Sequence, residues 1–190
     1  VPVAQLPSAR GDGLPVSAFI ELPAGVQIVG YAAGEAATPL VLATTLGYGF
    51  TCSLGDLVSR QKAGKQFLTL DEPALPLAPL VVQPRSDNLV ACLSSLGRLL
   101  VFEAAELRQL AGGGRGVILM DLQLGETLLA VQPCGVAGLR VSGTGRGGKP
   151  AELELKGKAL ETYRGKRARK GRALEIKFKA ERLARLAVPA

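Results

Sequence analysis

Histidine is absent from the 190 residues of this chain, and that absence removes several kinds of catalytic site. Ser-His and Cys-His nucleophile pairs, a His general base, and His-ligated zinc or iron all need its imidazole. The three cysteines, Cys52, Cys92 and Cys134, stand about 40 residues apart, which fits neither a CxxC metal site nor an even-numbered disulfide framework. We expect them to be reduced, small hydrophobic side chains of a core. We predict no catalytic residue, no metal ligand and no cofactor in this chain.

Aromatic residues are also scarce, at 4%, and no run of about 18 apolar residues is long enough to span a bilayer. The first residues lack the basic-then-apolar order of a secretion signal. With 47% hydrophobic residues, the chain can still build a core from Leu, Val and Ala. We therefore expect one globular domain over residues 1–190, located in the cytoplasm and without a membrane partner.

Positive charge is concentrated in the last third of the chain. There are 8 basic and 11 acidic residues up to Ala137, against 15 basic and 5 acidic residues after it. Six cations fall within the nine residues 164–172. A block of like charge repels itself and stays in solvent, so this segment is either an unpartnered loop or a binding site for a polyanion.

Three stretches of about 50 residues repeat one order of segments: an apolar hairpin, a short turn, a loop and a further short strand. The units are predicted at residues 39–87, 88–137 and 138–186, after a partial unit at about 1–38. The hairpin turns carry Gly47, Gly97 and Gly145, and the loops carry Gly13, Gly64, Gly114 and Gly171. Glycine at these places is typical of turns that need a positive φ.

Four strands are expected in each of the first two units, and three are identified in the third. Hairpin strands are predicted at 40–45 with 50–53, 89–94 with 99–102, and 139–142 with 151–155; loop strands at 67–70, 117–120 and 173–178; and further short strands at 80–82 and 127–131. Four strands in about 50 residues are typical of a propeller blade. We predict an all-β, propeller-like arc of four-stranded blades, about three complete and one partial, with its closure left open. An ordinary β-sandwich stays as an alternative, although it does not explain the matched spacing.

The loops at the same place in each unit carry a family resemblance. They read Gln-Lys-Ala-Gly-Lys-Gln at 61–66, Ala-Gly-Gly-Gly-Arg-Gly at 111–116 and Ala-Arg-Lys-Gly-Arg-Ala at 168–173. These resemble the Gln-Arg-Gly-Gly-Lys-Gly box in the C-terminal DNA-wrapping domain of bacterial type IIA topoisomerases. The segments 46–50, 56–58 and 63–65 resemble the tail of the topoisomerase IV A subunit more than that of gyrase. The similarity extends from about residue 10 to residue 186.

The resemblance implies a β-pinwheel that exchanges strands between blades and bends double-stranded DNA around a basic outer rim. It also implies a longer parent protein, an ATP-dependent type II topoisomerase whose cleavage tyrosine lies in an N-terminal core outside this chain. ATP and Mg²⁺ would act through other domains, and the partners would be that cleavage core and the B subunit of topoisomerase IV in an A2B2 holoenzyme. The domain would then be nucleoid-associated and would orient the transported DNA segment for relaxation and decatenation.

The residues expected to bind DNA are the cations of the three loops, because Lys and Arg on successive blades can neutralise phosphates and release counterions. These are Arg60, Lys62 and Lys65; Arg115; and Arg164, Lys166, Arg167, Arg169, Lys170 and Arg172. Cations of the hairpin turns, Arg98, Arg146 and Lys149, are expected as accessory contacts. Nothing in the pattern aims a helix or ribbon at base edges, so we expect binding without sequence specificity.

Other interpretations of the same residues carry less weight. Residues 143–148 match GxGxxG, but the alternating segment 151–155 that follows indicates a strand, not the helix of a nucleotide site. Glu103 and Glu106 share one turn and are expected to be merely solvated. Two alternative functions stay open. One is a gyrase-type wrapping domain, although Ala111-Gly112 replaces Gln-Arg in the second loop, and the other is a protein-binding propeller with an acidic partner.

Overall fold

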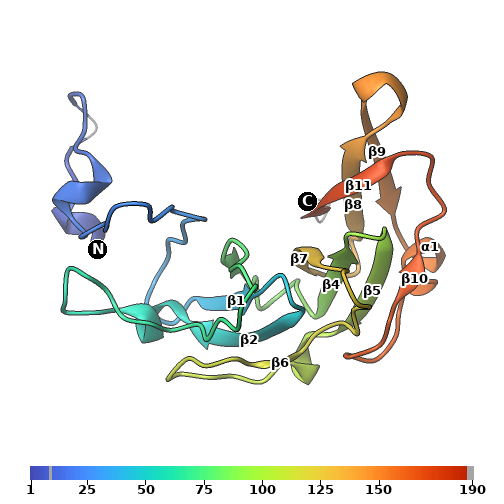
Figure 1. Ribbon diagram of the computed structural model, residues 1–190, viewed down its shortest axis with the longest axis horizontal. Coiled ribbons are helices and arrows are strands. Elements are labelled where there is room, and N and C mark those ends of the chain that lie inside the picture. The colour runs from blue at the N-terminus through green and yellow to red at the C-terminus, as the bar shows by residue number, and fades with distance from the viewer. Residues whose placement is uncertain (9, 188–190) are drawn as a thin grey trace.

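The computed structural model describes residues 1–8 and 10–187, and its strands form three antiparallel sheets that follow one another along an arc (Figure 1). This is the all-β, propeller-like arrangement that the repeats predict. In the described part of the chain, no helix is long and apolar enough to cross a membrane.

The first sheet combines strands from two repeats. Its order is β3 (Leu80–Val81), β1 (Pro39–Ala43), β2 (Tyr48–Ser53) and β6 (Val117–Ile118). The hairpin β1–β2 pairs Pro39 with Ser53 at one end and Ala43 with Gly49 at the other. The outer strand β6 belongs to the second repeat, so the first blade is completed by the unit that follows it.

The second sheet is built in the same way, and the third has one strand fewer. The second has the order β10 (Arg172–Ala173), β5 (Arg98–Glu103), β4 (Leu89–Ser94) and β7 (Leu128–Cys134). Its outer strand β10 comes from the third repeat. The third has the order β11 (Lys179–Arg185), β8 (Leu139–Thr144) and β9 (Pro150–Leu155), so β9 is an edge strand. The strand exchange implied by the family resemblance is therefore present at two successive blades.

Apolar side chains fill the layers between the sheets. Val41 of the first sheet and Phe102 of the second lie in one layer, and Val101 of the second and Val141 of the third lie in the next. A third cluster, around Leu40 and Phe50, covers the other face of the first sheet. Because successive residues of a strand point to opposite faces, each of the first two hairpins supplies two layers, which explains why these hairpins are apolar on both faces.

Short helical turns occupy the connections. They are the 3₁₀ turns η1 (Val3–Gln5), η2 (Val16–Ala18), η3 (Leu54–Leu57), η4 (Ala104–Glu106) and η5 (Arg146–Gly148), and the one-turn helix α1 (Lys158–Glu161). Among the described residues of 1–38, η1 and η2 are the regular elements and no strand is present.

The predicted hairpins, and the short strands predicted at 80–82, 117–120 and 127–131, are close to the structure, whereas two of the predicted loop strands differ. Residues 67–70, predicted as a strand, form an isolated bridge from Leu68 to Gly114. The strand predicted at 173–178 is limited to β10, and the long strand that pairs with β8 on the side opposite β9 is β11, which the sequence pattern did not indicate. Bulky apolar residues at 174, 176 and 178 pack against the neighbouring layer without joining a ladder, and this packing produced the misleading strand pattern.

The glycines that occupy equivalent places in the three loops are not the ones that the sequence predicts. Gly116 and Gly171 directly precede β6 and β10 and have φ values of 83° and 70°. Gly64, with φ 77°, lies three residues before buried Phe67, just as Gly116 lies three residues before buried Leu119. The equivalent of Gly64 and Gly171 is thus Gly116, not Gly114. In this register Arg115 corresponds to Lys170.

Candidate nucleic-acid interface

The three basic loops, here called the rim loops (residues 60–65, 111–116 and 164–172), extend from successive parts of the arc. In Figure 1 the first projects from the N-terminal end of the arc, and the second and third lie along its outer side. The second and third are attached by backbone hydrogen bonds to the repeat before them. The amide of Gly114 donates to the carbonyl of Phe67 at 2.8 Å, and the amide of Thr69 donates back to Gly114 at 2.9 Å. The third rim loop is attached through Ala168 and Arg169 to residues 119–121 in the same fashion. The exchange of strands between repeats, together with these hydrogen bonds, therefore sets the spacing of the loops.

The third rim loop carries four exposed cations: Lys166, Arg169, Lys170 and Arg172. None of them forms an ion pair with another described residue. Four unneutralised charges within seven residues produce a local positive potential. This loop is the most basic part of the described surface that the sequence singled out.

Two arginines of the same loop are occupied internally. Arg164 contacts the carboxylates of Glu103 and Glu161, the latter at 3.3 Å. Arg167 donates from its guanidinium to the carbonyl of Ile118, and its backbone amide donates to Glu106 at 3.0 Å. Both side chains join the third repeat to the second. Glu103 and Glu106, expected to be merely solvated, are thus the partners that position this loop.

Arg115 is the single cation of the second rim loop, and it has two partners. Its guanidinium lies over the ring of Tyr48, 4.4 Å from the centroid, and forms an ion pair with Asp71 at 2.5 Å. Tyr48 begins β2, so the side chain of the second repeat rests on the hairpin of the first. About half of the Arg115 and Asp71 side-chain surfaces stays exposed.

The first rim loop presents Arg60, Lys62 and Lys65 at the surface. The ammonium group of Lys65 donates to the carbonyl of Asp56 and lies 5.2 Å from the centre of the Phe67 ring. The carbonyl of Lys62 accepts from the amide of Glu21, which attaches this loop to the N-terminal segment. Arg60 and Lys62 form no ion pair among the described residues.

Of the three expected accessory cations, Arg98 differs from the other two. Its side chain is 12% exposed and forms an ion pair with Glu126, whose side chain is fully buried. Although burial of the carboxyl favours its neutral form, hydrogen bonds from Arg98 and from the Gln123 amide hold the pKa of Glu126 below its usual range. Arg98 therefore has an internal partner, and we assign it a structural role.

Arg146 and Lys149 are exposed on the turn between β8 and β9. Figure 1 places this turn at the opposite end of the third sheet from the third rim loop. Gly147 and Gly148 have φ values of 70° and 74°, and the next segment is strand β9. The GxGxxG pattern thus forms a hairpin turn, as the alternation at 151–155 predicts.

The structure also identifies residues that the sequence reasoning missed. Tyr48 and Asp71 surround Arg115, and Glu103 and Glu106 hold the third rim loop. Their partners lie 44 to 67 residues away in the chain, so no local motif marks them. The one available signal was their place in the turns that precede or follow each loop.

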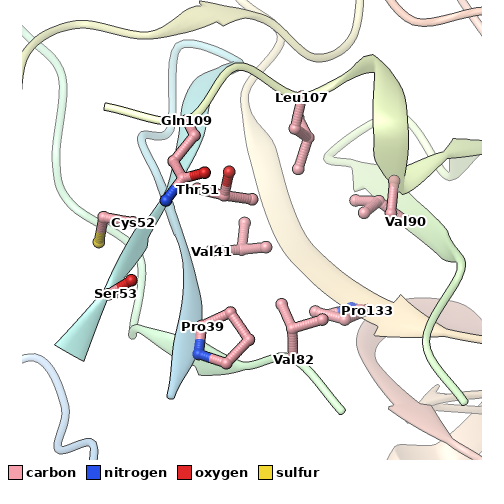
Figure 2. A pocket seen from close by; sticks show the side chains of 11 residues that line it. Pro39, Val41, Thr51, Cys52, Ser53, Val82, Val90, Leu107, Gln109 and Pro133 are labelled. Carbon is pink, nitrogen blue, oxygen red and sulfur yellow. The ribbon is translucent and has the colours of Figure 1, made fainter. Parts of the chain in front are cut away.

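A cavity of about 150 Å³ lies between the first two sheets, away from these loops (Figure 2). Its lining is uncharged, and Figure 2 shows the Cys52 sulfur turned away from its centre. Burial raises the pKa of Cys52 to about 11 and that of Cys134 to about 12, and it also raises the pKa of Cys92. Among the described residues, no cluster of three or more Cys, Asp or Glu could hold a metal ion.

Comparison with known proteins agrees with this architecture. Residues 38–74 and 88–134 match the family model described as "DNA gyrase C-terminal domain, beta-propeller". The A subunit of DNA topoisomerase 4 from Neisseria gonorrhoeae is 34% identical over 180 residues, which cover 93% of this chain and 23% of that protein. The Escherichia coli K12 protein of the same name is 40% identical over 108 residues, 57% of this chain and 14% of that protein. The chain thus spans less than a quarter of the length of these relatives.

Solved structures show the same fold. The structure of the E. coli ParC C-terminal domain matches with a TM-score of 0.80 and 26% identity, covering 95% of this chain and 74% of that chain. The DNA gyrase A C-terminal domain matches with a TM-score of 0.68 and 19% identity, covering 88% of this chain and 56% of that chain, a likeness of fold alone. The strands exchanged between successive sheets, the repeats and these relatives lead to one conclusion. The chain belongs to the family of gyrase A-like C-terminal β-pinwheel domains found in the A subunit of topoisomerase IV.

Proposed function

We propose that this domain binds and bends duplex DNA along its rim loops without reading its sequence. The observation that carries the proposal is the succession of three basic loops along one arc, spaced by the backbone contacts between successive repeats (Figure 1). DNA carries one charge per roughly 1.7 Å of its axis, so phosphates are available to the cations of each loop that reaches the duplex.

The third rim loop is the proposed main contact. Lys166, Arg169, Lys170 and Arg172 reach solvent, and none is neutralised by a described carboxylate. Arg60, Lys62 and Lys65 of the first loop extend the contact to the other end of the arc. Arg164 and Arg167 shape the third loop through Glu103, Glu106 and Ile118, and Arg146 and Lys149 stay proposed accessory contacts.

In the parent protein, the domain would orient the DNA segment that a type II topoisomerase transports during ATP-dependent relaxation and decatenation. This part of the proposal follows from the A-subunit relatives, of which this chain matches less than a quarter. The N-terminal cleavage core and the B subunit would be its partners in an A2B2 assembly, and ATP and Mg²⁺ would act there. The incomplete boxes of the loops support relaxation and decatenation over gyrase-type wrapping.

The test is a salt titration of duplex binding. Replacing Lys166, Arg169, Lys170 and Arg172 together with Gln should reduce the slope of log K against log salt by about 0.9 for each lost phosphate contact. The matched control replaces Arg85, Lys158, Lys177 and Arg182 with Gln, which removes the same charge at exposed residues outside the rim loops that form no ion pair with a described residue. Equal slopes for the two variants would remove the third rim loop from the interface.

Bending is measured separately, by the change in end-to-end distance of a labelled duplex of about 30 bp. Smooth bending of a site of 20–30 bp costs roughly 1–6 kcal/mol, so loss of a few cations should abolish the bend while the duplex stays bound at low salt. A bound duplex that is straight with the unchanged domain would contradict the bending part of the proposal.

A further inference from the structure

The ion pair between Asp71 and Arg115 lies where the proposed DNA path crosses the second rim loop. We propose that Asp71 competes with DNA phosphate for Arg115 and so keeps the single cation of this loop out of the contact with DNA. This inference rests on the proposed function. The second rim loop would then be the weak point of the interface because of one carboxylate, not because it lacks a cation.

The geometry places both groups within reach of a ligand. The guanidinium of Arg115 lies 2.5 Å from a carboxylate oxygen of Asp71, and 51% and 46% of the two side chains are exposed. Stacking of Arg115 on Tyr48 at 4.4 Å leaves the edge of the guanidinium, which carries the N–H donors, for an anion. A phosphate arriving from solvent and the carboxylate of Asp71 would use the same donors.

The backbone holds Asp71 at this place. Two residues before it, Thr69 donates to Gly114 at 2.9 Å, and Gly114 donates to Phe67 at 2.8 Å. Gly114 directly precedes Arg115, so the two partners extend from neighbouring points of one bridge. The pairing therefore does not depend on long flexible segments finding each other.

The next repeat has an amide in place of this carboxylate and supplies an internal comparison. The bridges Leu68 to Gly114 and Met120 to Arg169 are equivalent, so Gln123 takes the place of Asp71 and Lys170 the place of Arg115. Lys170 forms no ion pair with the described residues around it and stays exposed. At these equivalent positions, one unit thus has a cation and a neutral amide, and the unit before it has a cation and an acid.

The test is a double-mutant cycle on duplex binding by this chain. Asp71→Asn should raise affinity about three- to tenfold near 100 mM salt and steepen the salt slope by about 0.9, because one phosphate contact is gained. Arg115→Gln alone should change affinity less than twofold, and it should remove the gain when combined with Asp71→Asn. Asp71→Gln, which copies the next repeat, should behave like Asp71→Asn.

Glu72→Gln is the matched control, because it removes the same charge one residue away and Glu72 forms no ion pair among the described residues. Its effect should be smaller and independent of Arg115. If Asp71→Asn and Glu72→Gln raise affinity equally, or if the gain survives Arg115→Gln, this inference is overturned while the proposed function stands. If the unchanged chain binds no duplex at low salt, the proposed function fails first. An unchanged melting temperature confirms that each variant is folded.

Discussion

At the scale of single residues, the arginines divide into those that hold the molecule together and those left at its surface. Arg98 belongs to the first group, with Nε donating to Glu126 at 2.9 Å and both groups shielded from water. Arg172 and Arg169 belong to the second. Charge alone does not separate the groups. A partner within the protein does, as Glu126 is for Arg98 and Glu103 is for Arg164.

The first prediction concerns the buried pair. Arg98→Ala should lower the free energy of unfolding by about 3–5 kcal/mol at pH 7, because it leaves the Glu126 charge buried without its partner. Arg115→Ala, which breaks an exposed pair with Asp71, should cost less than about 1 kcal/mol. Urea unfolding of both variants measures the difference, and similar losses would contradict the structural role of Arg98.

The same pair predicts a pH dependence. The folded-state pKa of Glu126 is lowered, so its contribution to stability is fully present above the unfolded carboxyl pKa of about 4.3 and is lost as pH falls through the lower folded value. The stability difference between the unchanged chain and Arg98→Ala should therefore narrow below about pH 4. A constant difference between pH 7 and pH 3 would show that the effect is loss of packing and not of charge.

The thiols give a third prediction. Because burial raises the pKa of Cys52 to about 11 and that of Cys134 to about 12, and also raises that of Cys92, little thiolate is present at pH 8. A maleimide should label the folded chain far more slowly than a chain unfolded in urea, in which three thiols react. Rapid labelling of one folded-state thiol would contradict its burial.

At the scale of elements, the exchanged strands depend on glycines at their entry. A Cβ on Gly116 would lie 2.2 Å from the carbonyl oxygen of Gly49, and one on Gly171 would lie 2.6 Å from that of Leu99. Both residues also have positive φ. No other residue type allows β6 and β10 to approach the preceding sheet this closely.

Gly116→Ala and Gly171→Ala should therefore each destabilise the fold by about 1–3 kcal/mol through strain and displacement of the exchanged strand. The control is Gly112→Ala in the same loop, where an added Cβ meets nothing within 4 Å and φ is not positive. Thermal unfolding separates them. Equal melting temperatures for Gly112→Ala and Gly116→Ala would contradict the close approach.

The hairpins could be predicted from sequence because local alternation and turn glycines report on pairing between neighbouring segments. The exchange could not, because a two-residue strand such as β10 carries no information about which sheet it joins; only the family resemblance implied it. For the candidate site, the cations were visible in the composition of the loops. Their carboxylate partners were not, because Asp71 meets Arg115, and Glu103 meets Arg164, only after the sheets have assembled.

At the scale of the whole molecule, the arc presents different chemistry on equivalent faces. Leu89, Ala91 and Val101 of the second sheet lie in the apolar layer towards the third sheet. The last pair before the hairpin turn is Leu93 with Leu99 in the second sheet and Thr144 with Pro150 in the third. When the two hairpins are aligned on these pairs, Arg140, Ser142 and Glu152 of the third sheet take the places of Leu89, Ala91 and Val101. Arg140 forms ion pairs there with Glu154 at 2.7 Å and Glu152 at 3.7 Å. The face of the third sheet that points away from the second sheet is therefore polar, whereas the equivalent face of the second sheet is apolar.

Giving this face the residues of its counterpart should make the chain self-associate. The triple change Arg140→Leu, Ser142→Ala and Glu152→Val creates an exposed apolar patch of the kind that the second sheet buries. Light scattering should show a mass that rises with concentration to about twice that of the unchanged chain or more. A variant that stays at the mass of the unchanged chain would show that the face tolerates apolar residues in water.

The passing of β6 and β10 to the preceding sheet also has a consequence for synthesis. Since chains are made from the N-terminus, the edges of β2 and β5 stay unpaired until the following repeat has emerged and folded back. Each blade is then finished one repeat late, and an interruption of translation leaves an exposed strand edge that invites aggregation. The order of synthesis and the topology are therefore linked, because the third repeat, which is made last, supplies the strand that completes the second sheet.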